Sequence, residues 1–244
     1  MFGSAEGIVN QFRRWRLTGP RALSRALAAT LFPPRCCLCG FRGASMDLDL
    51  CGVCHSDLPW NGHELPGVLA PLRFEHPVDE MIRKLKYHGA IEHARVLGVL
   101  LAAAARARAA ELPRLLVPVP LHGARLRERG FNQAYALARY AGRMLEVPYA
   151  RTLIRRVRDT PSQTALDMAA RRHNVRGAFA VCGPRAMARL LAAEHVAIVD
   201  DVMTTGSTLA ELRAVLYAAG VRRVELWAVA RAMPSIRDTP ANER

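Results

Sequence analysis

The stretch that decides the fold is His195-Val196-Ala197-Ile198-Val199-Asp200-Asp201-Val202-Met203-Thr204-Thr205-Gly206-Ser207-Thr208-Leu209. Its apolar run over 196–199, bounded by polar residues, predicts a buried strand. Apolar residues at helical spacing predict a helix over 209–219. A strand, a short loop and a helix N-terminus bring loop amides and the positive end of the helix dipole to one point. The stretch therefore predicts a binding site for a phosphate group.

The side chains between this strand and helix fit the same ligand. Gly206 lets the backbone approach a phosphate closely. The hydroxyl donors around it are Thr204, Thr205, Ser207 and Thr208. Asp200 and Asp201, at the carboxyl end of the strand, suit sugar hydroxyls or a hydrated Mg²⁺. The alternative is an ordinary strand-to-helix turn in which the threonines and the serine cap the helix.

Four apolar residues, two acids and a threonine- and glycine-rich loop resemble the motif by which type I phosphoribosyltransferases bind 5-phosphoribosyl 1-pyrophosphate (PRPP). The resemblance implies that Asp200 and Asp201 are the catalytic acids, that the loop 204–208 binds PRPP, and that Mg²⁺ accompanies it. The hypoxanthine-guanine branch has a carboxylate where this chain has Thr204. The resemblance therefore does not extend to that branch.

The length and hydropathy of the chain indicate one large domain with a small appendage. Its 244 residues suffice for a substantial core. The longest apolar run, 96–105, is too short to span a bilayer, and the N-terminus lacks the pattern of a signal peptide. We therefore expect a soluble, cytoplasmic protein with no membrane span.

The net charge of +14 is concentrated in two regions. Residues 1–35 hold six arginines and one glutamate, and residues 121–176 hold twelve arginines and four acids. Such patches indicate a polyanionic partner: a phosphorylated substrate, a nucleic acid or both. Solvated arginines that aid solubility are the alternative. Residues 1–34 form either a basic amphipathic helix or a loosely packed extension.

Two C-x2-C pairs, separated by eleven residues, predict a four-cysteine zinc ribbon over 35–60. The predicted ligands are Cys36, Cys39, Cys51 and Cys54. Four thiolates leave no open coordination position, so the zinc is expected to be structural. Disulfides and a redox C-x2-C are the alternatives, but cytosolic thiols stay reduced and a redox site needs no second copy. Cys37 and His55 are interpreted as bystanders.

Between the ribbon and the phosphate motif, the sequence predicts a mainly helical segment. Residues 60–72 are rich in proline and glycine and indicate a linker. Helices are expected over 78–87, 91–111 and 134–145, and a strand over 115–119. A further strand is expected over 223–229.

A basic segment at 121–133 follows the strand at 115–119 and contains Arg125, Arg127 and Arg129. We expect a loop here, and the family resemblance implies that it binds the pyrophosphate of PRPP, since guanidinium groups bind phosphate oxygens bidentately. A surface loop with helix-capping charges is the alternative. Residues 151–177 resemble the mobile catalytic loop of the same enzymes, or else form a basic linker.

A four-cysteine ribbon followed by these segments in this order resembles the ComF family, which is linked to natural competence. The resemblance implies an α/β fold: a type I phosphoribosyltransferase domain over 61–231, with a mostly parallel sheet flanked by helices, behind the zinc ribbon. The basic extension 1–34 and a tail at 232–244, expected to be disordered, lie outside it.

Two classes of function follow from the sequence. In the first, the protein is an enzyme that displaces pyrophosphate from PRPP. In the second, it is a non-catalytic DNA-uptake factor that binds single-stranded DNA, with PRPP or a nucleotide as a regulatory ligand. The family resemblance implies the DNA-uptake machinery as a partner, and no residue identifies an acceptor substrate.

Overall fold

The computed structural model describes residues 35–43, 48–63, 65–108, 111–158 and 175–232. The expected basic extension and nearly all of the expected tail lie outside these residues. So does the segment 159–174 within the expected mobile loop.

A parallel sheet of five strands forms the centre of the molecule. The strands are β1 (Val68–Leu69), β2 (Leu72–Arg73), β3 (Leu115–Pro118), β6 (His195–Met203) and β7 (Arg223–Arg231). Their order is β1-β7-β6-β3, with β2 also pairing β7, and every pairing is parallel. The expected α/β fold with a mostly parallel sheet is confirmed.

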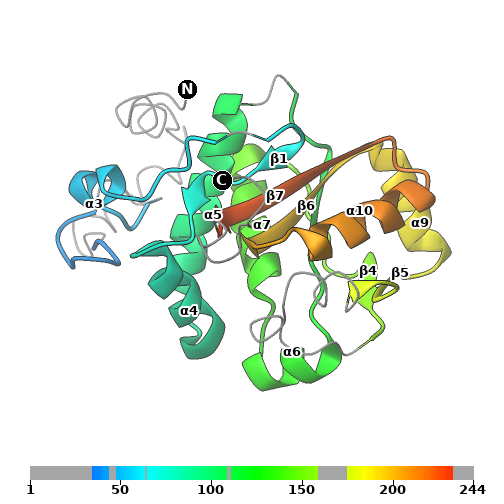
Figure 1. Ribbon diagram of the computed structural model, residues 1–244, viewed down its shortest axis with the longest axis horizontal. Helices are drawn as coiled ribbons and strands as arrows, with labels where there is room; N and C mark the ends of the chain where they lie inside the picture. Colours follow the sequence, from blue (N-terminus) through cyan, green and yellow to red (C-terminus); the bar gives the residue numbers. More distant parts are fainter. Residues whose placement is uncertain (1–34, 44–47, 64, 109–110, 159–174, 233–244) are drawn as a thin grey trace, which may run out of the picture.

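Helices cover both faces of this sheet (Figure 1). In chain order, the helices of the described part of the chain are α3 (Gly52–Ser56), α4 (Val78–His88), α5 (Ile91–Arg108), α6 (Gly123–Arg129), α7 (Gln133–Leu145), α9 (Pro184–Ala193) and α10 (Ser207–Ala218). A separate antiparallel pair joins β4 (Ile154–Arg156) to β5 (Phe179–Val181).

Side chains alternate along β6, so the strand contributes to two cores. Ala197 and Val199 pack in one hydrophobic cluster with α4, α5 and α7. Val196 and Ile198 pack in a second cluster with α9 and α10. Because the strand is covered on both sides, it reads as a continuous apolar run, as expected for a parallel sheet.

Helix α5 is buried along most of its length and lies close to α7. A Cβ added at Gly98 would lie 2.8 Å from Cβ of Tyr140 and 2.9 Å from the carbonyl oxygen of Leu137. Glycine at this position therefore allows the close approach of the two helices.

The interpretation of 60–72 as a linker was wrong. Residues 68–69 and 72–73 are short strands that pair with β7, and Leu69 and Leu72 are buried in the core. The segment 121–133 also differs from the expected loop, because residues 123–129 form α6. Its N-cap is His122, whose ring accepts a hydrogen bond from the amide of Ala124.

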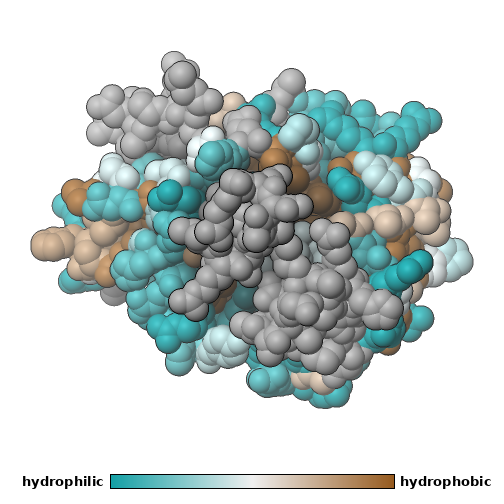
Figure 2. Space-filling view, viewed as in Figure 1, coloured by the Kyte–Doolittle hydropathy of each residue, from teal (hydrophilic) through white to brown (hydrophobic). Residues whose placement is uncertain are grey.

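The four-cysteine region is packed on the main core. Cys36, Leu48 and Leu50 are buried in the cluster that contains α5. Asp49 pairs with Arg95 of α5. Figure 2 shows apolar surface at the left of the molecule, the side on which α3 lies. Val53 of α3 is 71% exposed. Within the described ranges, no helix is long and apolar enough to cross a membrane.

Candidate functional site

The segments predicted to bind PRPP meet at the carboxyl edge of the sheet. The amide of Val119, just after β3, donates to the carbonyl of Val199, just before the two acids (2.9 Å). Asn132 fixes the other end of the basic segment: its Nδ2 donates to the carbonyl of Val119 (2.9 Å), and its Oδ1 caps α7. The basic segment therefore begins beside the acids, at the edge where open α/β sheets bind ligands.

The hydroxyl loop leads directly into α10. Gly206 has φ of 73° and is the N-cap of α10, and its carbonyl accepts the first helical hydrogen bond, from Ala210 (2.8 Å). A residue with a side chain is strained in this conformation. The helix begins at Ser207, two residues before the expected start, so Ser207 and Thr208 lie in its first turn.

The capping interpretation of these hydroxyl groups accounts for little of the loop. Gly206 has no side chain with which to cap, and no side-chain cap bond is made there. Thr205 accepts a long hydrogen bond from the amide of Ser207 (3.4 Å) and donates to its hydroxyl (3.1 Å). The first amides of a helix have no intrahelical partner, so this N-terminus retains the character of an anion site.

Asp200 and Asp201 lie near the carboxyl end of β6, where this strand still pairs with β7. As consecutive residues of a strand, they have their side chains on opposite faces of the sheet. Asp201 is 4% exposed, whereas Asp200 is half-buried. Oδ1 of Asp200 accepts from the amide of Asp201 (2.9 Å), and Oδ1 of Asp201 from the amide of Val202 (3.0 Å). Burial, and then the neighbouring charge of Asp201, raise the pKa of Asp200 well above its usual value.

Lys86 of α4 is a member of this site that the sequence analysis missed. Its Nζ lies 2.7 Å from Oδ2 of Asp201. The helical pattern placed Lys86 on the polar face of α4, but nothing in the sequence connects it to an acid over a hundred residues later. The lysine supplies a positive charge that the hydroxyl loop lacks.

The predicted pyrophosphate-binding arginines lie on α6, so they do not form one row. Arg125 and Arg129 are four residues apart and share a side of the helix, whereas Arg127 lies on a different side and is exposed. The guanidinium of Arg129 stacks over the ring of Tyr87, 5.3 Å from its centroid. This contact joins α6 to the end of α4 that carries Lys86.

The four predicted zinc ligands come together. The sulfur atoms of Cys36, Cys39, Cys51 and Cys54 all lie within 4.8 Å of one another. The sulfurs of Cys39 and Cys51 are 3.6 Å apart and are not joined by a disulfide. A tetrahedral ion with metal–sulfur bonds of about 2.3 Å sets its sulfurs roughly 3.8 Å apart, so the cluster fits such an ion.

The backbone around the cysteines supports the same interpretation. Gly40 has φ of 75° and donates to the carbonyl of Cys36 (2.9 Å), which closes the turn of the first pair. Cys51 is the N-cap of α3, and its sulfur accepts from the amide of Cys54 (3.4 Å). Amide donors of this kind stabilise thiolates.

The neighbouring candidates lie outside the cluster, as expected. Burial raises the pKa of the Cys37 thiol to about 12, so it stays protonated. Cys36, by contrast, belongs to the cluster: hydrogen bonds with the backbone of Cys39 and Cys51 outweigh the effect of its burial and lower its pKa to about 6. His55 is buried against Trp60, and burial lowers its pKa.

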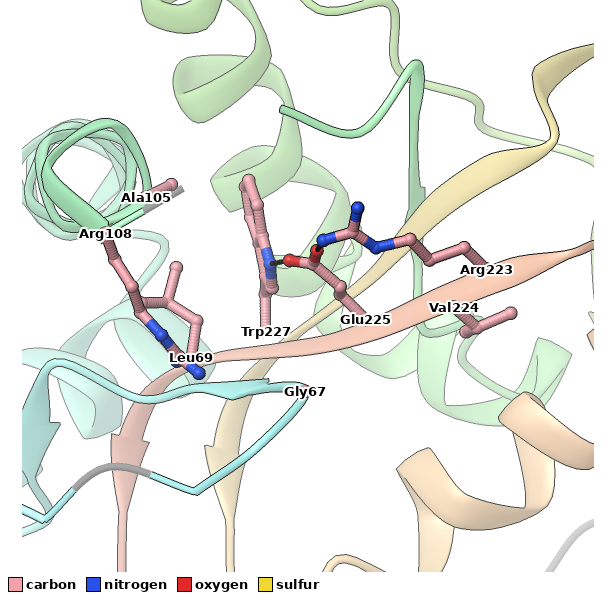
Figure 3. A pocket seen from close by; sticks show the side chains of 8 residues that line it. All are labelled: Gly67, Leu69, Ala105, Arg108, Arg223, Val224, Glu225 and Trp227. Carbon is pink, nitrogen blue, oxygen red and sulfur yellow. Dashed lines mark hydrogen bonds and ion pairs between the residues drawn. The ribbon is translucent and has the colours of Figure 1, made fainter. Parts of the chain in front are cut away.

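A cavity of about 350 Å³ lies at the opposite edge of the sheet, around the beginning of β7 (Figure 3). Its charged lining consists of Arg108, Arg223 and Glu225. One oxygen of Glu225 accepts from Arg223 (2.8 Å) and is 2.9 Å from Nε2 of His195, and the other accepts from Trp227 (3.0 Å). Arg108, on the other wall, donates to backbone carbonyls. These charges are engaged with the protein itself.

Comparisons with known proteins identify a family and a domain. The phosphoribosyl transferase domain family matches residues 126–239. Competence protein F of Haemophilus influenzae is 31% identical over 201 residues, covering 80% of this chain and 84% of that protein. DNA utilization protein YhgH of Escherichia coli K12 is 32% identical over 203 residues, covering 81% of this chain and 84% of that protein. The relative of the same name in Salmonella typhimurium is also 32% identical.

Proposed function

Since the chain belongs to the competence protein F family, we propose that it binds PRPP with Mg²⁺ at the carboxyl edge of its sheet and acts in DNA uptake or utilization. The observation that carries the proposal is the start of α10. The left-handed Gly206 directly precedes the helix, no side chain caps it there, and the residues on both sides of Gly206 carry hydroxyl groups. The 5-phosphate of the ligand would bind there.

The acids supply the second half of the proposed site. Asp200 and Asp201 follow the apolar part of β6, where the hydroxyl groups of a bound ribose would lie if the 5-phosphate occupies the α10 turn. Carboxylates accept hydrogen bonds from such hydroxyls. Mg²⁺, when bound, would neutralise charge on the pyrophosphate. The arginines of α6 would contact the same group.

A transfer reaction at this site would break the bond between the anomeric carbon and pyrophosphate, and an acceptor nucleophile would form the new bond. Positive charge develops on the sugar and negative charge on the leaving pyrophosphate. In this proposal, the carboxylates of Asp200 and Asp201 stabilise the positive charge on the sugar. The arginines of α6 stabilise the negative charge on the leaving pyrophosphate. Pyrophosphate release in the presence of a panel of bases and amines tests this activity.

The binding proposal is tested by calorimetric titration of the purified protein with PRPP, with and without Mg²⁺. We expect binding that requires Mg²⁺, and a thermal shift that grows with ligand concentration. Ribose 5-phosphate, which lacks the pyrophosphate, is the matched control and should bind more weakly. Equal affinity for both ligands would contradict a role for Mg²⁺ and the arginines.

For the cysteine cluster we propose a structural zinc ion. The fit of four sulfurs to a tetrahedron supports it. Metal analysis of reduced protein should give one zinc per chain. Cys39→Ser should lose the zinc and unfold the ribbon, because such sites fold with their metal, whereas Cys37→Ser should retain it. Zinc-free wild-type protein that keeps its fold would contradict the proposal.

A second candidate function is the binding of single-stranded DNA, with PRPP as a regulatory ligand. The exposed Arg127 on α6 and the names of the relatives, competence protein F and DNA utilization protein YhgH, support it. Contacts with phosphates release counterions, so the logarithm of affinity should fall linearly with the logarithm of salt concentration. Fluorescence anisotropy with a labelled oligonucleotide measures this slope. Absence of binding at low salt would exclude this candidate.

A further inference from the structure

The contact between Lys86 and Asp201 is the feature of the site that the proposed function leaves unexplained. Nζ of Lys86 is 2.7 Å from Oδ2 of Asp201, and the two side chains are 23% and 6% exposed. An ion pair on the surface contributes little and is easily broken. This pair is sheltered, so its two charges are held together in the ligand-free protein.

The elements that carry the two residues fix this contact. Asp201 continues the face of β6 that begins with Ala197 and Val199, which is the face covered by α4 and α5. Helix α4 is anchored on that face by Met81 and Ile82, which are both 1% exposed. Lys86 lies one helical turn after Ile82 in α4, and its side chain contacts Asp201.

The end of α4 is fixed as well. The helix ends at Gly89, which has φ of 62° and adopts the left-handed conformation of a helix C-cap. Tyr87, next to Lys86, contacts the guanidinium of Arg129. The backbone of Lys86 is thereby positioned between the acids and α6, and its flexible four-carbon side chain remains free to redirect the ammonium group.

We propose that Lys86 is an internal counter-ion that occupies the cation position at Asp201 until a metal–PRPP complex arrives. This inference rests on the proposed function, because it concerns the order in which that ligand and its metal bind. The ammonium group and a divalent cation need the same carboxylate oxygen. The free protein therefore resists binding a divalent cation alone, and the metal enters with the pyrophosphate.

A second consequence follows for the ammonium group. When PRPP brings its own cation to Asp201, Lys86 turns from the acid toward the side of α6, where the pyrophosphate would lie. A lysine there neutralises a phosphate as a point charge. Lys86 is a positioning residue by this account, and its removal alters metal binding before it alters any chemistry.

The test measures the binding of Mn²⁺ alone to zinc-loaded protein, by electron paramagnetic resonance of the free ion. Lys86→Met keeps the length of the side chain and removes its charge. We expect at least about a tenfold gain in Mn²⁺ affinity over the wild type, because an opposing charge has left the carboxylate. Lys86→Gln should show the same gain, and circular dichroism identifies any variant that does not fold.

Lys84→Met is the matched control. Lys84 lies on the same helix and pairs with Glu80 at 3.0 Å, but both side chains are exposed, 46% and 36%. Its removal should leave Mn²⁺ binding unchanged. Adding Asp201→Asn to Lys86→Met should abolish the gain, which assigns the Mn²⁺ to this acid rather than to the cysteines.

Equal Mn²⁺ affinity in the wild type and in a folded Lys86 variant would overturn the inference. If PRPP binds the wild type with Mg²⁺ in that case, the proposed function stands without it. A gain in Mn²⁺ affinity in a protein that never binds PRPP would have the opposite meaning: the counter-ion role would stand, and the ligand of the site would have to be sought among other metal-bound anions.

Discussion

The two ends of the strand pair β6–β7 both carry acids that are buried or half-buried, but the acids have different surroundings. At the amino end, Glu225 is in contact with His195, Arg223 and Trp227, three side chains of the same two strands. At the carboxyl end, Asp200 and Asp201 accept from the amides of the residues that follow them, and Lys86 reaches only one of the two.

This difference distinguishes a structural role for Glu225 from the binding role proposed for Asp200 and Asp201. A carboxylate surrounded by its own partners contributes to the stability of the strands and offers little to a ligand. At the carboxyl end one lysine pairs with Asp201 alone, and Asp200 is not paired with it, beside the N-terminus of α10. The charges that line the cavity at the amino end are already paired within the protein, so we favour the carboxyl end as the place where a ligand binds.

The largest expected effect is on folding stability and concerns Glu225, at the amino end of the strand pair. Glu225→Ala leaves buried donors without a partner and should lower the free energy of unfolding by about 3 kcal/mol. Denaturant titration measures it. Glu75→Ala is the control, since Glu75 pairs with Arg73 at the surface, and it should cost at most about 0.5 kcal/mol.

PRPP should still bind to folded Glu225→Ala protein with unchanged affinity. A loss of binding there would show that the two ends of the strand pair are not independent.

The next effect concerns the binding end. Asp200→Asn combined with Asp201→Asn removes two charged acceptors and should weaken binding of PRPP with Mg²⁺ by at least about 100-fold. The unliganded protein should keep its melting temperature within a few degrees, because the mutual repulsion of the acids is lost together with the pair to Lys86. Asp57→Asn, on an exposed residue, is the control. Full retention of the thermal shift would exclude the acids from the site.

A third substitution separates PRPP from DNA. Gly206→Val places a branched side chain at φ of 73° and should weaken PRPP binding by about tenfold or more. Most of the affinity for single-stranded DNA at low salt should remain, because the arginines are unchanged. Gly62→Val is the matched control, at a position with open space. Equal loss of both ligands in a folded variant would mean that they share one site.

The smallest effect is on the pH dependence of stability. The raised pKa of Asp200 means that the folded protein binds a proton that the unfolded chain has already lost. Between the usual value of 3.8 and the raised pKa, this group makes stability fall as pH rises, by at most about 1.4 kcal/mol per pH unit. Asp200→Asn should remove that slope in zinc-loaded protein without Mg²⁺. A parallel pH profile in both proteins would contradict the assignment.

Features that are local in the sequence were predicted well. The strand at 196–199, the glycine turn and the helix after it follow one another, so spacing alone identifies them. The four cysteines form two short pairs whose separation is typical of a ribbon. The strands at 115–118 and 223–231 are apolar and continuous, as strands in a covered sheet must be.

Features that depend on distant contacts were missed. Residues 68–69 and 72–73 are strands only because β7 lies beside them, and two-residue strands have no periodicity of their own. Residues 123–129 form a helix in which no residue is buried, so no apolar stripe indicates it. The pairing of Lys86 with Asp201 depends on how α4 packs against β6, which no local pattern encodes.

The four-cysteine ribbon and α5 share one hydrophobic core, so the ribbon and the sheet domain depend on each other for folding. Leu48 and Leu50 are fully enclosed in the cluster that supports the sheet, and Asp49 between them pairs with α5. A shortened chain beginning at residue 61 would leave that side of α5 facing water. The ribbon is therefore part of the folded domain and cannot be deleted or replaced on its own during evolution without exposing apolar surface. Its loss would demand simultaneous replacement of the apolar surface beneath it.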